Sequence, residues 1–448
     1  MAAADTVNGE VVELLQQLIR NACVNDGTPE SGGEDRSADV LQSFLEGSGL
    51  DLQRYEPIAG RASLVGRLEG TDPSAPSLLL MGHTDVVPVT AENWRHDPFG
   101  AEIVDGEIWG RGAVDMLNLT ASMAVAVKRF ASSGARPRGT LIYLGVADEE
   151  ALGTHGAKWL VDNEPDAVRA DYVVTESGGY RLPLGSPSDP KLPIVVAEKG
   201  TYWCRIRVRG TPGHGSMPFR TDNALVKAAE VVRRIAEYRP DTDVHEVWRR
   251  FVDAADLPQE LGDALRDPAR VREFVEHGDI GLARMVYSCT HTTFAPTVVH
   301  GGVKTNVIPD TVDLEIDIRT LPGQTGPDIE AMLAEALGDL YDQVEITPIS
   351  GDESGASAID TPLFESLQKV SAKLVPGSQT IPFMLVGATD ARFFRRAGAV
   401  AYGYGLFSER ISFADYATMF HGDNERIDLE SLRLVTELWE AVLQDFLL

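Results

Sequence analysis

Cysteine is scarce in this sequence, which has 448 residues and only Cys23, Cys204 and Cys289. Because the three are odd in number, far apart and in no CxxC spacing, they indicate neither a disulfide framework nor a thiolate zinc site. Long apolar runs are also missing, and no stretch reaches the roughly 18 residues of a membrane span. The first residues lack a basic segment followed by an apolar one, which predicts a cytoplasmic protein.

Basic residues are few: 40 Lys and Arg stand against 68 Asp and Glu, a formal net charge of −28. Such a chain repels polyphosphate and offers no basic stripe, so nucleic acid is excluded as an expected partner. The excess of carboxylates is typical of a solvated surface, and it also suits a site that collects divalent cations. The length predicts two or three domains.

Three segments share one pattern, in which an apolar strand-like run is followed at once by polar residues. They are SLLLMGHTD (77–85), TLIYLGVADEE (140–150) and DYVVTESGG (171–179). Continuous apolar runs separated by helical patterns favour an α/β fold with a buried sheet. Because ligands bind at the carboxyl ends of the strands in such sheets, the polar residues are expected to line a crevice.

From residue 199 the pattern changes to strict alternation, as in TYWCRIRVRG (201–210). With the segments that follow, and with a charged helical insertion at 241–285 left out, the order of elements is βαββαβ, the split βαβ sandwich. The sequence therefore predicts a catalytic domain formed by residues 1–198 and 352–448, interrupted by a smaller α+β domain at 199–351. It does not indicate what the insertion does.

A set of nitrogen and oxygen ligand types recurs at the ends of these patterns. The residues are His83, Asp85, Asp115, Glu149, Glu150, Glu176 and His421. A sulfur-free set of this kind suits two zinc ions, with one carboxylate bridging them and a position left open for water. Neighbours on a strand end point to opposite sides, so the adjacent Glu149 and Glu150 are expected to differ, one binding metal and the other staying free as a base.

The order of the motifs resembles a known enzyme family. The motifs are MGHTDVVP, GRGAVDM, ADEEALG, TESGG, GTPGHGSMP, TNVIPD and FHGDNERI. They are similar to those of the co-catalytic zinc hydrolases that include aminoacylase, carboxypeptidase S, glutamate carboxypeptidase and succinyl-diaminopimelate desuccinylase. The resemblance covers the chain from about residue 10 onward. It implies a mixed-sheet zinc-peptidase catalytic domain with an inserted ferredoxin-like domain that serves as lid and dimerisation domain.

The resemblance also implies a role for each candidate ligand. Asp115 would bridge two zinc ions, with His83 and Glu176 on one ion and Glu150 and His421 on the other. Glu149 would be the general base and acid. The Asp85 carboxylate would accept the second ring N–H of His83 and fix its orientation. Cobalt or manganese ions suit the same ligands.

Further residues match family positions that act on the substrate. The resemblance implies that His214 reaches the neighbouring subunit's site and stabilises an oxyanion there, so a homodimer is expected. Asn306 and Arg319 match substrate contacts, and Arg392, after the Gly387 turn, is a second candidate for binding a carboxylate. Glu176 occupies a position that is glutamate in the aminoacylase and desuccinylase groups, which favours acyl amino acid substrates.

The sequence thus predicts hydrolysis of an amide bond next to a free carboxylate, in an N-acyl amino acid or a short peptide. Two alternatives stay open. An aminopeptidase or dipeptidase would act on unblocked peptides through the same metal chemistry. A non-catalytic binding module would have lost a ligand or the base, whereas this sequence has all of them.

Overall fold

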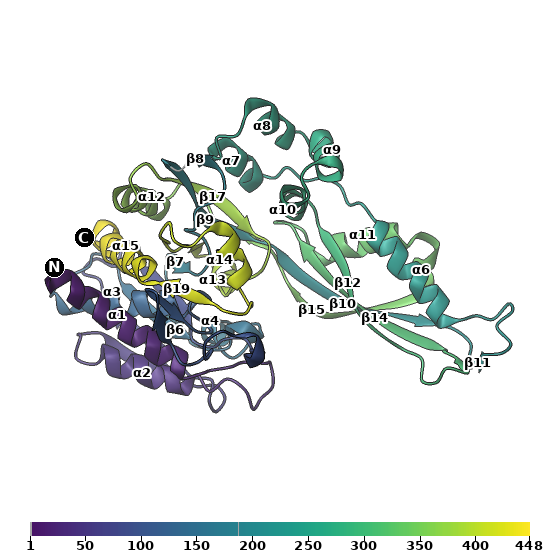
Figure 1. Cartoon of the computed structure of the whole chain (residues 1–448), viewed down its shortest axis with the longest axis horizontal. Coiled ribbons are helices and arrows are strands. Elements are labelled where there is room, and N and C mark those ends of the chain that lie inside the picture. The colour runs from purple at the N-terminus through teal and green to yellow at the C-terminus, as the bar shows by residue number, and fades with distance from the viewer. Residues whose placement is uncertain (1, 187) are drawn as a thin grey trace.

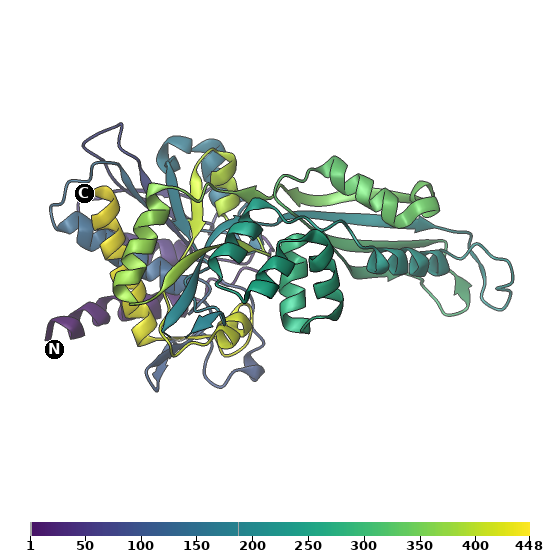
Figure 2. The same cartoon turned by 90° about the horizontal axis from the view of Figure 1, so that it is seen from above.

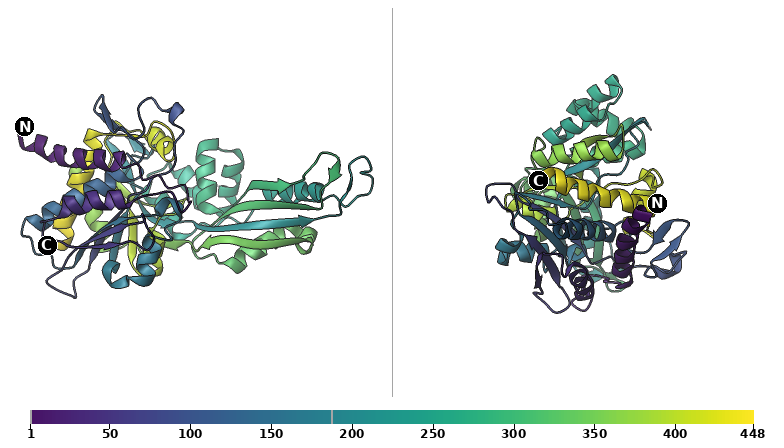
Figure 3. Two further views of the ribbon diagram at one scale, coloured as in Figure 1. Left: turned by 90° about the horizontal axis from the view of Figure 1, so that it is seen from below. Right: turned by 90° about the vertical axis from the view of Figure 1, so that its left-hand side faces the viewer.

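A computed structural model describes residues 2–186 and 188–448, and it divides into a larger and a smaller body (Figure 1). The larger body contains both the beginning and the end of the chain, whereas the smaller body extends away from it as a narrow arm built from the middle of the chain. The views from below and from the side show the same arrangement, with both termini on the larger body (Figure 3).

Ten strands of the described residues form the mixed sheet of the larger body, in the order β1-β2-β6-β3-β7-β18-β9-β16, with β8 and β17 also paired to β9. Strands β3, β6, β7 and β18 run parallel, while β1 and β2 pair antiparallel. Every residue of β3 and β6 is buried, as their continuous apolar runs predict. The bounds are β1 (Asp51–Tyr55), β2 (Ser63–Leu68), β3 (Leu78–His83), β6 (Leu141–Val146), β7 (Tyr172–Thr175), β8 (Gly185–Ser186), β9 (Asp189–Glu198), β16 (Gly355–Ala356), β17 (Gln379–Leu385) and β18 (Val400–Gly403).

Helices cover both faces of this sheet and bury its apolar side chains in two cores. The larger core includes residues of α1 (Ala2–Arg20), α2 (Asp35–Leu45), α3 (Leu117–Ser132), α12 (Pro362–Leu374) and α15 (Leu429–Leu447). The smaller core includes residues of α4 (Ala157–Asn163), α5 (Pro165–Val168) and α13 (Ala391–Arg396). At one side, η1 (Ala91–Asn93) precedes a small sheet of β4 (Glu102–Val104), β5 (Glu107–Trp109) and β19 (Arg426–Asp428).

The smaller body is an antiparallel sheet in the order β12-β14-β10-β15. On β10, Cys204, Ile206 and Val208 are buried while Arg205 and Arg209 are exposed, which confirms the predicted alternation. The chain order is βαββαβ, as predicted, with both helices packed in one core. The bounds are β10 (Gly200–Arg209), α6 (Ala224–Glu237), β12 (Thr293–Gly301), β14 (Thr311–Thr320), α11 (Gly326–Leu337), η3 (Gly338–Gln343) and β15 (Val344–Asp352). At the far tip, β11 (Gly213–His214) pairs with β13 (Val307–Ile308).

The charged insertion folds into four helices at the junction of the two bodies (Figure 2). They are α7 (Glu246–Ala254), α8 (Gln259–Leu265), α9 (Pro268–His277) and α10 (Ile280–Thr290). Their buried side chains join the larger core rather than that of the smaller sheet, and the Phe251 ring meets Phe383 of β17 at 5.6 Å between centroids. The insertion therefore packs on the larger body, although it lies within residues 199–351. The division of the chain at residues 199 and 351 stays a prediction.

Strand β9 continues directly into β10 at Lys199, where the two bodies join. The Lys199 side chain is 1% exposed, and its Nζ donates hydrogen bonds to the carbonyl oxygens of Ser288 (3.0 Å) and His291 (2.7 Å). These carbonyls belong to the end of α10, so the buried Lys199 amino group ties the insertion to the junction. Among the described helices, none combines the length and the apolar character that a membrane crossing requires.

Candidate metal centre

Three of the candidate ligands follow parallel neighbouring strands. His83 is the last residue of β3, Glu150 lies in the short 3₁₀ helix η2 (Glu149–Ala151) after β6, and Glu176 follows β7 directly. Because β3 pairs in parallel with both β6 and β7, the three side chains meet at one edge of the sheet. This is the crevice that the sequence predicts.

Asp115 lies between two histidines that come from distant parts of the chain. Its Oδ1 is 3.3 Å from His83 Nε2, and its Oδ2 is 3.4 Å from His421 Nε2. The aspartate follows the Gly112 turn, where φ is +88°, and precedes α3. A carboxylate that offers one oxygen to each side has the geometry of a bridging ligand.

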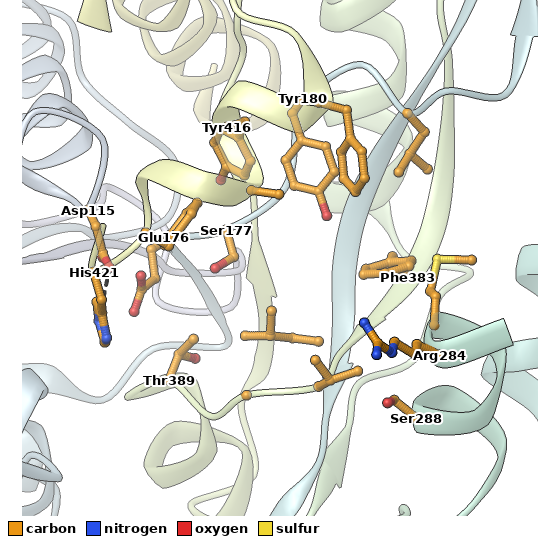
Figure 4. Close-up of a pocket in the computed structure, with 18 of the residues that line it drawn as sticks. Asp115, Glu176, Ser177, Tyr180, Arg284, Ser288, Phe383, Thr389, Tyr416 and His421 are labelled. Atoms are coloured by element: carbon orange, nitrogen blue, oxygen red, sulfur yellow. Dashed lines mark ion pairs between the residues drawn. The ribbon is translucent and has the colours of Figure 1, made fainter. Parts of the chain in front are cut away.

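Two groups of ligand atoms share this aspartate. His83, Asp115 and Glu176 form one group, and Asp115, Glu150 and His421 form the other, with the atoms of each group within 4.8 Å of one another. His421 Nε2 is 3.1 Å from Glu150 Oε2, and His83 Nε2 is 4.0 Å from Glu176 Oε2. Figure 4 shows Asp115, Glu176 and His421 at one end of a cavity. The structure thus brings all five predicted ligands together.

The charges of the cluster fit bound cations. Burial raises the pKa of Glu150, Glu149 and Glu176 above the ordinary value because it removes the water that stabilises their charged form, and the charges of neighbouring carboxylates raise it further. Glu150 Oε1 is buried and has no hydrogen-bond partner among the described residues. The atoms that would bind a metal are imidazole nitrogens and carboxylate oxygens, which suit zinc and related divalent ions. Divalent cations would supply the positive charge that the cluster calls for.

The two histidines have raised pKa values. For His421, hydrogen bonds to Asp115 and Glu150 raise the pKa to about 10. For His83, burial lowers the pKa, but the hydrogen bond to Asp115 and the charge of Glu176 outweigh burial and raise it well above 6.5. The same carboxylates that attract protons here attract a metal ion, so metal binding is expected to compete with protonation.

The orientation of His83 differs from the expected one. Its Nδ1 lies 2.9 Å from the backbone oxygen of Asp85 and 3.6 Å from the Asp85 carboxylate, so the backbone carbonyl is the acceptor. The carboxylate instead accepts the backbone N–H groups of Glu149 (3.2 Å) and Glu150 (3.0 Å), and the side-chain amide of Asn25 (2.9 Å). With a spacing of two residues, the Asp85 backbone already reaches the ring, which leaves its side chain to position the two glutamates.

Glu425 holds the loop that carries the bridging aspartate, and the sequence analysis missed it. Its buried carboxylate accepts hydrogen bonds from Arg111 Nη1 (2.8 Å) and from the backbone N–H groups of Gly112 (2.9 Å), Val114 (2.7 Å) and Asp115 (2.9 Å). It lies four residues after His421, so one C-terminal loop supplies both a ligand and this support. The signal was a charged residue inside the FHGDNERI motif that no assigned role explained.

Strained backbone marks the same loops. Asp148, which precedes Glu149, has φ +70°, and Ser177, which follows Glu176, has φ +71°. His421 itself has φ +55°. Side chains other than glycine seldom adopt these angles, and they persist where the surrounding hydrogen bonds fix the backbone.

Glu149 differs from Glu150 in its contacts. Both line the cavity, yet only Glu150 belongs to a ligand group. For Glu149, burial raises the pKa well above 4.5, the charge of His83 opposes this, and the charge of Asp390 adds to it. A carboxyl with a raised pKa that lies beside the ligands is suited to exchanging protons near neutral pH.

The predicted substrate residues are spread over the molecule. Gly387 lines the cavity. His214 and Asn306 lie together at the far tip of the smaller body, where Gly215 donates its N–H to the Asn306 oxygen at 2.8 Å, and His214 Nδ1 is 2.8 Å from Ser216 Oγ. Within one chain this tip lies far from the ligands (Figure 1).

Neither predicted carboxylate-binding arginine lines the cavity. Arg392 donates to the carbonyl oxygens of Thr389 (2.6 Å) and Leu152 (2.9 Å) and pairs with Asp352 at 3.2 Å. Arg319 forms two hydrogen bonds to Asp317, at 2.8 and 3.1 Å. Both guanidinium groups are engaged within the chain, Arg392 with a carboxylate remote in sequence and Arg319 with one two residues away. Their contact with the substrate carboxylate stays a prediction. Among the described residues that line the cavity, Arg284 is the one lysine or arginine.

The fold and the ligand cluster together define a class: metal-dependent hydrolases that act at the edge of a mixed α/β sheet. The comparisons with known proteins make this specific. Residues 79–445 match peptidase family M20/M25/M40, and the chain belongs to this family. It is therefore a hydrolase of amide bonds.

The relatives include enzymes for acylated amino acids. The chain is 27% identical over 461 residues to the Xenopus tropicalis N-fatty-acyl-amino acid synthase/hydrolase PM20D1, covering 99% of this chain and 87% of the relative. It is 28% identical over 445 residues to aminoacylase-1 of Sus scrofa, covering 96% of this chain and 95% of the relative. Among solved structures, the M20 family metallo-carboxypeptidase Sso-CP2 from Sulfolobus solfataricus has a TM-score of 0.74 at 17% identity, covering 98% and 99% of the two chains, which shows the shared fold.

Proposed function

We propose that the protein hydrolyses the amide bond of an N-acyl amino acid or a short peptide, next to a free carboxylate, with two zinc ions per subunit. The observation that carries the proposal is the pair of ligand groups that share Asp115, with Glu149 beside them and outside both. His83 and Glu176 would hold one ion, and Glu150 and His421 the other. The aminoacylase and fatty-acyl-amino acid hydrolase relatives support the acyl amino acid as substrate.

The residues of the chain have separate tasks in this reaction. Bound zinc supplies a Lewis acid for the scissile carbonyl and lowers the pKa of water. Glu149 accepts the proton of the attacking water and returns it to the leaving amine, which its raised pKa favours. Asp85 keeps the backbone of both glutamates in place, and Glu425 does the same for Asp115.

The subunit arrangement and the location stay predictions. We propose a homodimer in which His214 of one subunit completes the site of the other, because the tip that carries His214 and Asn306 projects away from its own ligand cluster (Figure 1). The cytoplasmic location stays a prediction from the sequence.

The test is a metal-reconstituted assay with a panel of N-acyl amino acids and with blocked and unblocked dipeptides. We expect turnover of substrates with a blocked amine and a free carboxylate. Selective cleavage of unblocked dipeptides would instead favour the aminopeptidase or dipeptidase alternative. Metal analysis should find two divalent ions per chain.

Glu149→Gln tests the assignment of the base. We expect this variant to keep its metal while kcat falls by about 10² to 10⁴-fold, since the amide cannot accept the proton. Glu92→Gln, the same change at an exposed position, is the matched control and should leave kcat unchanged. Near-normal turnover by Glu149→Gln would remove the base from the proposal.

A further inference from the structure

The cavity at the ligand cluster continues into a groove of mainly apolar walls. The cavity and the groove together have a volume of about 920 Å³, close to the upper end of the range for small-molecule sites. From the ligands the groove passes Ser177 and Thr389 toward Tyr180 and Phe383 (Figure 4). One rim is α10 of the insertion, and the other is α14 (Phe413–Met419). The apolar side chains that line it include Leu182, Phe251, Leu282, Met285, Leu385 and Phe413.

The apolar surface of this groove calls for a ligand. Leu282, Met285 and Phe413 are half-buried, and Val386, which also lines the groove, is 43% exposed. Folded proteins seldom leave a contiguous apolar surface open to water unless it binds something apolar. An acetyl group or a single small side chain would leave most of a 920 Å³ space unfilled.

The insertion builds one wall of the groove and holds it in place. At the start of α10, the Asp279 carboxylate accepts the N–H groups of Gly281 (3.1 Å) and Leu282 (3.2 Å). At its end, the buried Lys199 amino group donates hydrogen bonds to two of the last carbonyl oxygens. With both ends anchored, Leu282 and Met285 have fixed positions over the groove. The insertion, whose task the sequence did not indicate, thus forms part of the cavity wall.

The distribution of charge indicates which half of the substrate enters the groove. The ligand end is lined by acidic residues, while Arg284 lies at the opposite end, beside Phe383 (Figure 4). In an N-acyl amino acid the free carboxylate is attached one carbon from the scissile nitrogen, too near the ligands to reach Arg284. This arrangement favours an amino acid half that points out of the groove and an acyl half that lies along it.

We propose that the groove holds a long, unbranched, apolar acyl chain, and that α10 of the insertion sets the preference for chain length. This inference rests on the proposed function, because it takes the scissile amide to lie at the ligand cluster. It assigns Leu282 and Met285 as residues that determine specificity. It names the acyl class, long-chain N-acyl amino acids, that the proposed function leaves open.

The first experiment is a series of N-acyl derivatives of one amino acid, from acetyl to dodecanoyl, assayed with the metal-loaded protein. We expect kcat/KM to rise about fourfold for each added CH₂ until the groove is filled, which corresponds to about 0.8 kcal/mol per CH₂. A flat or falling series would overturn the inference while leaving the proposed amide hydrolysis intact.

Binding provides a readout that does not depend on turnover. Calorimetry with metal-loaded Glu149→Gln should give a Kd for the dodecanoyl compound at least about 100-fold below that for the acetyl compound. Equal affinities would overturn the inference. If affinity rises with chain length but the active protein cleaves no acyl amino acid, the proposed reaction fails and the groove assignment stands.

Variants of α10 test whether this helix determines the preference for acyl chain length. Met285→Trp fills the groove, so the preferred chain should become shorter, whereas Leu282→Ala should lower the dodecanoyl-to-acetyl ratio of kcat/KM by about tenfold. The matched control is Ile280→Ala, since Ile280 is on the same helix, is 65% exposed and does not line the groove. The control should keep the wild-type ratio. An unchanged chain-length profile in both groove variants would remove α10 as the determinant.

Discussion

The ligand cluster and the tip of the smaller body are built in opposite ways. At the cluster, five side chains from five distant segments lie close together, most of them buried although His421 is exposed, and hydrogen bonds such as those of Glu425 fix the Asp115 loop. At the tip, His214 is exposed on a two-residue strand pair, with Ser216 as its side-chain neighbour. The difference teaches that metal ligands need fixed positions, whereas the role that we propose for His214, acting on another subunit, needs reach.

The sharpest test of this contrast is His214→Ala. If the imidazole stabilises the oxyanion in a neighbouring site, kcat should fall by about 10² to 10³-fold while the metal content stays the same. Metal analysis beside steady-state kinetics measures both. Full activity would show that the tip takes no part in the chemistry.

Mixing subunits distinguishes action in trans from action within one chain. A reassembled equal mixture of Glu149→Gln and His214→Ala subunits contains one intact site in each mixed dimer, so it should regain about a quarter of wild-type activity. Light scattering checks that dimers form. A mixture no more active than its parents would place His214 in its own subunit's reaction or in none.

Asp85→Ala tests the other side of the comparison, the need for fixed positions. The carboxylate holds the backbone N–H groups of Glu149 and Glu150, so its loss should reduce kcat or metal affinity by about 10 to 100-fold. Metal titration and kinetics separate the two effects. Asp26→Ala, an exposed aspartate in a neighbouring loop, is the control and should change neither.

Lys199→Met gives the smallest expected effect on activity and tests the junction between the larger and the smaller body. Burial lowers the pKa of Lys199 from 10.5 to about 7, so between pH 7 and 10.5 the unfolded chain binds a proton that the folded chain does not. In this window Lys199 makes the free energy of unfolding rise with pH, by up to about 1.4 kcal/mol per pH unit, and the stabilisation is lost as pH falls toward 7.

The variant should lack this rise, so its stability relative to wild type should improve from pH 9 to pH 7. Denaturant unfolding at both pH values measures the difference. Parallel changes in the two proteins would contradict a depressed pKa at Lys199.

Much of the site follows from local sequence patterns. An apolar strand that ends in a polar residue puts that residue at the edge of a parallel sheet, which is why His83 and Glu176 could be placed without a structure. The alternation of Cys204, Ile206 and Val208 with polar residues identified the smaller sheet, because successive side chains of a strand point to opposite faces.

Long-range pairing is what the sequence could not reveal. Nothing near Arg392 indicates that Asp352 and the Leu152 carbonyl occupy its guanidinium. The helical pattern of the insertion identifies helices, but it does not indicate which of two sheets they cover, so the packing of Phe251 on Phe383 required the structure. The missed role of Glu425 has the same origin, because its partners lie more than 300 residues earlier in the chain.

The bond between Glu425 and the Asp115 loop also bears on how the enzyme comes into being. A ribosome makes the Asp115 loop about 300 residues before it makes the His421 ligand and the Glu425 carboxylate that secures the loop. Until residue 425 has been made, the nascent chain has an incomplete set of ligands and an unsecured Asp115 loop. The hydrolytic site can therefore form only after residues 421–425 have been synthesised.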